Sequence, residues 1–197
     1  SEQCENFVSS WFFNTESMKF FVFDSSFGQD IFTTRDEINI FGEQFNKIMQ
    51  NKKPIWFLTH RPLWRSPKKE FLMLHNYGNL SQIEAFADKF PDNVAAIVSG
   101  HIHIAQILLM KNVPDQIIVG NGGALLHAQS QDPIYQNVEF NYSRNKRYLA
   151  HEIKNFFDFG FAVLNLDDHE LTFYNKNNNK IYSAMLTEDF RISRTMN

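Results

Sequence analysis

The chain lacks several features that would assign it to a class at once. Its 197 residues include a single cysteine, Cys4, so no internal disulfide can hold the fold together. No apolar run reaches the roughly 18 to 20 residues that a membrane-spanning helix needs. The net charge is only −3, and no cluster of basic residues indicates a nucleic-acid-binding surface. The first residues lack the pattern of a signal peptide, and because a targeting segment would lie on a preceding part of the protein, the compartment stays open.

What the sequence does contain is a large share of apolar and aromatic side chains. Hydrophobic residues make up 43% of the chain, charged residues make up 21%, and 21 residues are phenylalanine. These proportions are typical of a globular protein with a packed interior. A chain of this length is expected to form one domain with a sizeable core.

Strand-like and helix-like segments alternate along the first half of the chain. Apolar runs at 18–24, 55–59 and 94–99 predict buried strands. Capping-box spacing at Thr34 and Glu37, and again at Ser81 and Glu84, predicts the start of a helix before the second and the third strand. A βαβαβ series predicts parallel strands joined by right-handed crossovers.

The second half of the chain has a different pattern. Strands are predicted at 105–110 and 116–120, joined by a turn that contains a proline. The polar stretch 130–155 shows little periodicity and is predicted as loop with short helical turns. The remaining segments predict a closing antiparallel meander, with strands at 159–166, 171–174 and 180–186.

Three histidines follow the ends of two predicted parallel strands. His60 comes directly after 55–59, and His101 and His103 come directly after 94–99 in the sequence Gly-His-Ile-His. Ligands of open parallel sheets gather beyond the carboxyl ends of the strands, and neutral imidazole is a good ligand for zinc, iron and manganese. Each signal is weak alone, because such a histidine often packs in the core or faces water. Together, at two strand ends, they predict a metal site.

These segments resemble two motifs of the calcineurin-like metallophosphoesterase superfamily, in the form seen in bacterial proteins similar to purple acid phosphatases. Thr59-His60-Arg61-Pro62 resembles the HxP motif, and Gly100-His101-Ile102-His103 resembles the GHxH motif. The glycine-rich sequence at 119–123 resembles the strand end that follows GHxH. The resemblance covers 18–186 and implies an α/β fold, the C-terminal half of an αββα sandwich. Residues 1–197 would then be the C-terminal portion of a single domain.

The resemblance also implies a site. His60 and His101 would bind one metal ion and His103 a second, both divalent or trivalent (Fe, Mn or Zn), for the hydrolysis of a phosphate ester. Arg61 is a candidate for neutralising a phosphate oxygen, with packing over a helix face as the alternative. Asn121 is a candidate for a position near the substrate, with a turn role in Asn-Gly-Gly as the expected alternative. His75 and His127 are candidate outer-site residues that no motif supports.

The motifs that supply the family's other ligands are absent from this sequence. The family carries DxH, GDxxD and GNH motifs near its N-terminus, whereas this chain contains no Gly-Asp and no Gly-Asn-His. Its one DxH match, Asp167-Asp168-His169, falls in a predicted hairpin turn. Three neutral imidazoles would hold one ion at best. We therefore predict that this chain alone is inactive and that an N-terminal segment of the same protein, on another chain, completes the site.

Two other functions stay open on the sequence alone. The chain is compatible with a non-catalytic interaction module of the same fold that has lost its metals, or with a mononuclear metal-binding protein. Metal content separates the three, because the enzyme needs two ions per complete site, the mononuclear protein one and the module none. The substrate is not indicated, since monoesters, diesters, nucleotides and phosphoproteins are all hydrolysed on this scaffold.

Overall fold

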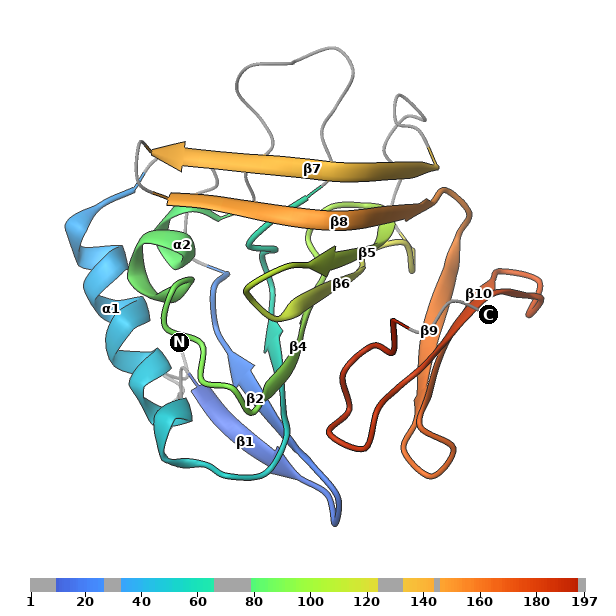
Figure 1. Ribbon diagram of the computed structural model, residues 1–197, viewed down its shortest axis with the longest axis horizontal. Helices are drawn as coiled ribbons and strands as arrows, with labels where there is room; N and C mark the ends of the chain where they lie inside the picture. The colour runs from blue at the N-terminus through green and yellow to red at the C-terminus, as the bar shows by residue number, and fades with distance from the viewer. Residues whose placement is uncertain (1–9, 27–32, 66–78, 124–132, 144–145, 195–197) are drawn as a thin grey trace, which may run out of the picture.

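The computed structural model describes residues 10–26, 33–65, 79–123, 133–143 and 146–194, which form three layers (Figure 1). The elements are, in chain order, β1 (Ser10–Asn14), β2 (Lys19–Phe23), α1 (Arg35–Phe45), the 3-10 helix η1 (Asn46–Gln50), β3 (Ile55–Thr59), α2 (Leu80–Phe86), β4 (Val94–Ser99), β5 (Ala105–Met110), β6 (Asp115–Val119), β7 (Ile134–Ser143), β8 (Lys146–Phe156), β9 (Gly160–Asn165), β10 (Glu170–Asn175) and β11 (Lys180–Met185). No helix in the described part of the chain has the length and apolar character needed to cross a membrane.

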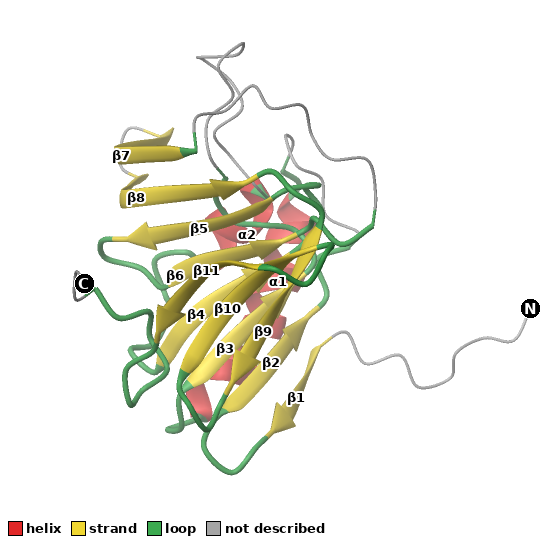
Figure 2. Ribbon diagram, turned by 90° about the vertical axis from the view of Figure 1, so that its right-hand side faces the viewer, coloured by secondary structure: helices red, strands yellow, loops and turns green. Residues whose placement is uncertain are grey.

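The middle layer is an eight-stranded sheet with strand order β1-β2-β3-β4-β6-β5-β8-β7. A second sheet of three strands, in the order β11-β10-β9, lies over part of one face, and helices α1 and α2 cover the other face (Figures 1 and 2). Strands β2, β3, β4 and β6 run parallel to one another, as the predicted βαβαβ series requires. The closing meander is confirmed as the antiparallel strands β9, β10 and β11.

The predicted N-cap residue is correct for helix α1 but not for helix α2. Thr34 caps α1 as expected, with its side chain accepting a hydrogen bond from the Glu37 amide at 3.1 Å. The prediction for α2 was wrong, because Asn79 is the cap and accepts from the Gln82 amide at 2.8 Å. Asparagine caps a helix as well as serine does. Ser81 therefore lies inside α2, and its hydroxyl donates to the Glu37 carboxylate at 2.5 Å, which ties the two helices together.

The predicted loop at 130–155 was also wrong, because most of it forms the long antiparallel strands β7 and β8. An irregularity between Leu109 and Met110 of the neighbouring β5 shifts the register with β8. The buried side chains of β8 are consequently spaced by two and then by three residues, at Tyr148, Ala150 and Ile153. A bulge of this kind hides the alternation that marks a strand in the sequence. Strand β1, antiparallel to β2, was not predicted either.

Two hydrophobic cores lie on opposite faces of the large sheet. The core under the helices is rich in phenylalanine, and the Phe45 and Phe86 rings stack at 4.4 Å between α1 and α2. The core between the two sheets contains Trp56 of β3 and Phe173 of β10. The Trp56 indole N–H donates to the Phe190 carbonyl at 3.0 Å, so a residue after β11 satisfies the one polar atom of this side chain.

A buried carboxylate at the start of β6 predicts a pH dependence of stability. Asp115 is 5% exposed and accepts hydrogen bonds from the Met110 amide at 2.7 Å and from Arg194 at 3.0 Å. Burial raises the pKa of Asp115 to about 6, although the Arg194 guanidinium opposes the shift. The folded chain thus binds this proton more tightly than the unfolded chain, so the stabilisation is complete below the ordinary pKa of 3.8 and is lost as pH rises through 6.

We expect the free energy of unfolding to rise by up to about 3 kcal/mol between pH 7 and pH 4 on account of Asp115. In Asp115→Asn this contribution should disappear, because the amide has the same shape and does not titrate in this range. Urea unfolding of both proteins at the two pH values measures the difference. Identical pH profiles for the two proteins would contradict the assignment.

Candidate functional site

Two of the three predicted histidines lie side by side at one edge of the large sheet. Strands β3 and β4 are parallel neighbours, and their last residues, Thr59 and Ser99, are paired in register. The residues that follow are therefore adjacent, and the Gly100 amide donates to the His60 carbonyl at 3.1 Å. The topology alone thus brings the beginnings of the two histidine motifs together.

The imidazole rings of His60 and His101 meet edge to face, with an angle of 68° between the ring planes. His101 Nδ1 lies 3.1 Å from His60 Nε2, and the ring centroids are 4.9 Å apart. His101 has a φ of 63°, a left-handed backbone conformation that is uncommon for residues other than glycine. Unfavourable backbone of this kind often accompanies functional residues. Because His60 is exposed and His101 is half-buried, the pair is open to solvent on one side.

Arg61 contacts the pair from the adjacent position. Its Nη1 lies 3.1 Å from His101 Nε2, and its Nη2 donates to the Ser26 carbonyl at 3.4 Å. A guanidinium can only donate, so His101 Nε2 accepts this hydrogen bond. The proton of a neutral His101 then resides on Nδ1 and points to His60 Nε2. The side chain predicted to neutralise a phosphate oxygen therefore lies directly against one of the predicted metal ligands.

A buried network of polar side chains holds the segment from Thr59 to Arg61 in place. The Thr59 and Ser25 hydroxyls lie 2.7 Å apart, and Thr59 donates to the Gln82 side-chain oxygen at 3.0 Å. Ser25 accepts from the Arg61 amide at 2.9 Å, and the Gln82 amide group donates to the Arg61 carbonyl at 3.0 Å. The segment after β2 and helix α2 thus fix the backbone at the site. These supporting residues were not predicted, because no local pattern connects positions so far apart in the sequence.

His103 lies in the second of two consecutive tight turns. The Ile102 amide donates to the Gly100 carbonyl at 2.7 Å, and the Ile104 amide donates to the Ile102 carbonyl at 2.8 Å. Ile102 and Ile104 are buried, whereas His103 between them is half-exposed. In the part of the chain that the structure describes, no three histidine, cysteine, aspartate or glutamate residues gather closely enough to hold a metal ion. The structure brings His60 and His101 together, and the role of His103 stays a prediction.

The two ring nitrogens lie close enough to be brought onto one ion. Imidazole nitrogens lie about 2.0 to 2.1 Å from a bound zinc ion, so two of them on one tetrahedral ion are about 3.3 to 3.4 Å apart. The observed 3.1 Å is shorter than this and is the length of a hydrogen bond, so shared ligation would require the two rings to separate slightly. Ligation through His101 Nδ1 would place the ring proton on Nε2, where it would face another donor on Arg61. Metal binding at this atom would therefore require the Arg61 side chain to rotate away from the imidazole.

The glycine-rich end of β6 supports the loop that carries His101 and His103. A Cβ atom on Gly120 would lie 1.7 Å from the Ile102 carbonyl oxygen, and the Gly120 amide donates to the Ile104 carbonyl at 3.1 Å. Asn121 is buried, donates through its side chain to the Asp158 carbonyl at 2.9 Å and accepts from the Gly160 amide. Asn121 thus joins β6 to the turn before β9, which is the turn role expected of it.

The one DxH match of the sequence lies in a hairpin turn. Asp167-Asp168-His169 forms the turn between β9 and β10, where the His169 ring packs 4.5 Å from that of Phe190. The prediction that this DxH match is a hairpin turn is therefore confirmed. His75 and His127 lie outside the described residues.

Comparisons with known proteins identify the fold. No protein-family model and no curated protein matches the sequence. Among solved structures, a purple acid phosphatase, PPD1, from yellow lupin seeds aligns with a TM-score of 0.60 at 16% identity over 93% of this chain and 33% of its own. GAP50, described as the anchor in the inner membrane complex of Plasmodium, aligns with a TM-score of 0.47 at 16% identity over 94% of this chain and 54% of its own.

The chain therefore spans a third of the length of the lupin phosphatase and about half of that of GAP50. At this identity the likeness to the phosphatase concerns the fold. In this chain a parallel βαβαβ unit is followed by antiparallel strands, and a second sheet packs on the first. The protein has an α/β fold similar to that of part of the lupin purple acid phosphatase.

Proposed function

We propose that the chain is the C-terminal portion of a single metallophosphoesterase domain, and that this domain, once an N-terminal segment on another chain completes it, hydrolyses phosphate esters at a dinuclear metal site. The observation that carries this proposal is the pair of ring nitrogens, 3.1 Å apart, at the carboxyl ends of neighbouring parallel strands. The phosphatase-like fold supports it, because the pair lies where α/β sheets bind their ligands. The identity of 16% leaves the activity itself as our proposal.

In this proposal His60 and His101 hold one ion and His103 holds the second, with Fe, Mn or Zn as the metals. Bound ions would polarise the phosphoryl oxygens and supply a hydroxide at neutral pH. Arg61 then has a clear task. Once its contact with His101 is released, the guanidinium can bind a phosphate oxygen, for which its planar set of donors is well suited.

The site needs a second polypeptide segment. Two cations held close together require carboxylate ligands to balance their positive charge, because a neutral imidazole carries no negative charge. No described cluster of this chain supplies them. We infer that an N-terminal segment of the same protein, on another chain, contributes the carboxylates and that residues 1–197 alone do not hydrolyse phosphate esters.

Native mass spectrometry of the purified protein, combined with hydrolysis of p-nitrophenyl phosphate, tests the proposal. We expect two polypeptides and two metal ions per active complex, with activity lost on treatment with a chelator and recovered on addition of metal. A complex that binds no metal and hydrolyses no ester would instead favour the interaction module. One ion without hydrolysis would favour the mononuclear metal-binding protein.

A further inference from the structure

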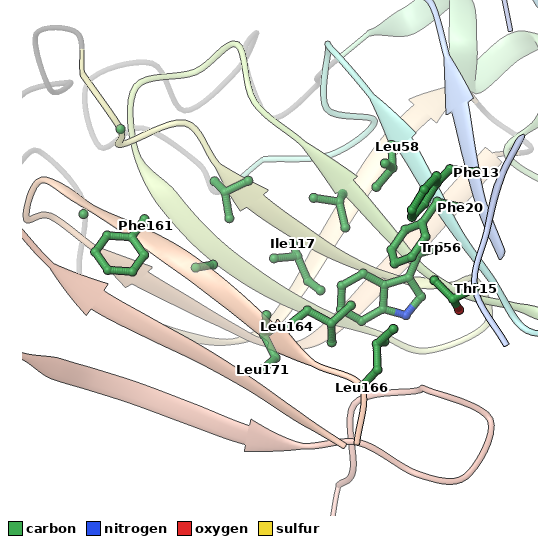
Figure 3. Close-up of a pocket in the computed structure, with 15 residues that line it drawn as sticks. Phe13, Thr15, Phe20, Trp56, Leu58, Ile117, Phe161, Leu164, Leu166 and Leu171 are labelled. Carbon is green, nitrogen blue, oxygen red and sulfur yellow. The ribbon is translucent and has the colours of Figure 1, made fainter. Parts of the chain in front are cut away.

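The cavities in the described part of the chain differ in chemical character. One cavity, of about 560 Å³, lies between the two sheets, and every side chain that lines it is uncharged. Figure 3 shows its apolar lining, with Phe13 and Phe20 of the large sheet and Leu164 of the small sheet. Another cavity, of about 360 Å³, is lined by charged side chains together with apolar ones. Its volume is in the range of small-molecule sites, so the chemistry of its lining indicates a class of ligand.

The charged cavity lies at the edge of the large sheet opposite to the histidine pair. Its lining includes Val94, which is the first residue of β4, and Pro114, which directly precedes β6. His60 and His101 follow the other, carboxyl ends of β3 and β4. Because β4 spans six residues, roughly 16 Å of strand separates the cavity from the beginning of the histidine motif. A small ligand in this cavity therefore cannot reach the histidines.

Four cationic side chains from three parts of the chain line this cavity, which we call the cationic cleft. They are Lys111 after β5, Arg147 near the start of β8, and Arg191 and Arg194 after β11. Two carboxylates, those of Asp88 and Asp92, also line the cleft. The Asp88 carboxylate accepts a hydrogen bond from the Tyr148 hydroxyl at 2.5 Å. Positive groups outnumber negative groups by four to two, so the cleft favours an anionic ligand.

Hydrogen bonds within the fold hold the Arg191 guanidinium in place. Its Nε donates to the Asp189 carboxylate at 2.9 Å, and its Nη2 donates to the Asp92 carbonyl. A guanidinium has five N–H donors, so these contacts leave part of the group available to a ligand. The side chain is partly exposed, at 37%. Arg191 is therefore oriented before a ligand binds, which lowers the entropy lost on binding.

Arg194 is held in a similar way, but by a carboxylate that is itself buried. Its Nη2 donates to the Met110 carbonyl at 2.5 Å and to the Asp115 carboxylate at 3.0 Å. The Arg194 side chain is 46% exposed, whereas that of Asp115 is 5% exposed. One side of the guanidinium thus faces a buried acid, and the other donors remain available at the cleft.

Lys111 and Arg147 are tied less strongly to the fold. The Lys111 amide donates to the Leu149 carbonyl at 2.9 Å, which places Lys111 beside the start of β8, and its side chain is exposed. Arg147 Nη1 lies 3.9 Å from the Glu139 carboxylate, and the Arg147 side chain is 67% exposed. An exposed pair at this distance contributes little to stability. Both cations are therefore suited to binding a ligand without a cost to the fold.

We propose that the cationic cleft binds a small organic phosphate. The planar donor sets of Arg191 and Arg194 match the oxygens of a phosphate group, and Lys111 adds a further positive charge. The cleft is much larger than a phosphate group alone, and its lining includes Phe90 and Val113, which can pack against the organic part of the ligand. This site is separate from the metal site and needs no bound metal.

Asp115 makes binding in the cleft depend on pH. The groups that face its carboxylate are the Met110 amide of β5 and the Arg194 and Arg191 guanidinium groups after β11. Burial raises the pKa of Asp115 to about 6, so the carboxylate that balances Arg194 at pH 7 is neutral at pH 5. Arg194 then offers its charge to the ligand alone. An anion is therefore expected to bind more tightly at the lower pH.

Isothermal titration calorimetry of the complete protein with phenylphosphonate, whose carbon–phosphorus bond is not a phosphate ester, tests the site. Lys111→Gln combined with Arg147→Gln should weaken binding at least about tenfold, because two charged donors are lost. Lys52→Gln combined with Lys176→Gln is the matched control, since both lysines are exposed and neither lines the cleft. It removes the same charge and should change affinity less than about twofold. Thermal unfolding shows whether each variant is folded.

Two further measurements separate the cleft from the histidine pair. Phenylphosphonate should keep its affinity for the cleft in His101→Ala. Inorganic sulfate, which stays doubly charged over this range, should bind about threefold more tightly at pH 5 than at pH 7, and Asp115→Asn should remove this difference. Equal affinities of the two double variants, or loss of binding in His101→Ala, would overturn the proposal. Inorganic phosphate that binds as tightly as phenylphosphonate would contradict the organic part of the ligand.

Discussion

His101→Ala is expected to lower kcat/KM for phosphate-ester hydrolysis in the complete protein by at least about a hundredfold. The imidazole contacts both His60, at 3.1 Å, and Arg61, at 3.1 Å, so its removal takes away a metal ligand and the group that positions the guanidinium. Steady-state kinetics and the metal content of the purified variant measure the effect. Full activity with two bound ions would remove His101 from the site.

The backbone of His101 requires a second variant and a control. With a φ of 63°, alanine at this position carries a left-handed conformation that costs roughly 1 to 2 kcal/mol, whereas glycine does not. His101→Gly should therefore lose the same activity as His101→Ala with a smaller loss of stability. His169→Ala is the matched control, because His169 also has a left-handed φ, of 51°, and lies in the hairpin turn between β9 and β10. It should lose stability and keep its activity.

Gly120→Ala is expected to destabilise the protein by about 3 kcal/mol or more and to disrupt the metal site at the same time. The new methyl group would lie 1.7 Å from the Ile102 carbonyl oxygen and 2.8 Å from its carbon. Both are backbone atoms of the loop between His101 and His103, so no flexible side chain can move aside. The loop must shift, and the Gly120 hydrogen bond to Ile104 is lost with it.

Urea unfolding and metal content, measured together, test this expectation. Gly100→Ala is the control within the same loop, since a Cβ at Gly100 meets no atom within 4 Å and the residue has no positive φ. It should change the unfolding free energy by less than about 1 kcal/mol and leave metal binding intact. If Gly120→Ala binds two ions as tightly as the unaltered protein, the loop is not held by this close approach.

The parts of the fold that were predicted are those that local pattern controls. The continuous apolar runs of β2, β3 and β4 favour strands that are largely buried, and parallel strands place their carboxyl ends together. The adjacency of His60 and His101 follows from these two facts. The contact of Arg61 with His101 does not, because it depends on a left-handed residue and on a network through Ser25 and Gln82. Ser25 and Gln82 are 36 and 21 positions from Arg61, and no periodic pattern in the sequence indicates a contact between residues so far apart.

The wrong predictions for the cap of α2 and for strand β8 also have their cause in contacts between distant elements. Asn79 and Ser81 are both good helix caps, and the choice between them depends on the tertiary hydrogen bond from Ser81 to Glu37. The bulge in β8, where Leu109 pairs with Glu152 and Met110 with Ala150, removes the regular alternation on which strand prediction depends. In both cases, contacts between distant elements override local preference.

The hydrogen bond from the Trp56 indole to the Phe190 carbonyl has a consequence for biosynthesis. These two residues are 134 positions apart, and both belong to the core between the sheets. A ribosome must therefore extend the chain at least as far as Phe190 before the indole of β3 finds its partner. Until then an aromatic face stays open to other nascent chains, and contacts this distant in sequence also slow folding. We therefore expect the nascent chain to expose, until that point, apolar surface of the kind that chaperones shield.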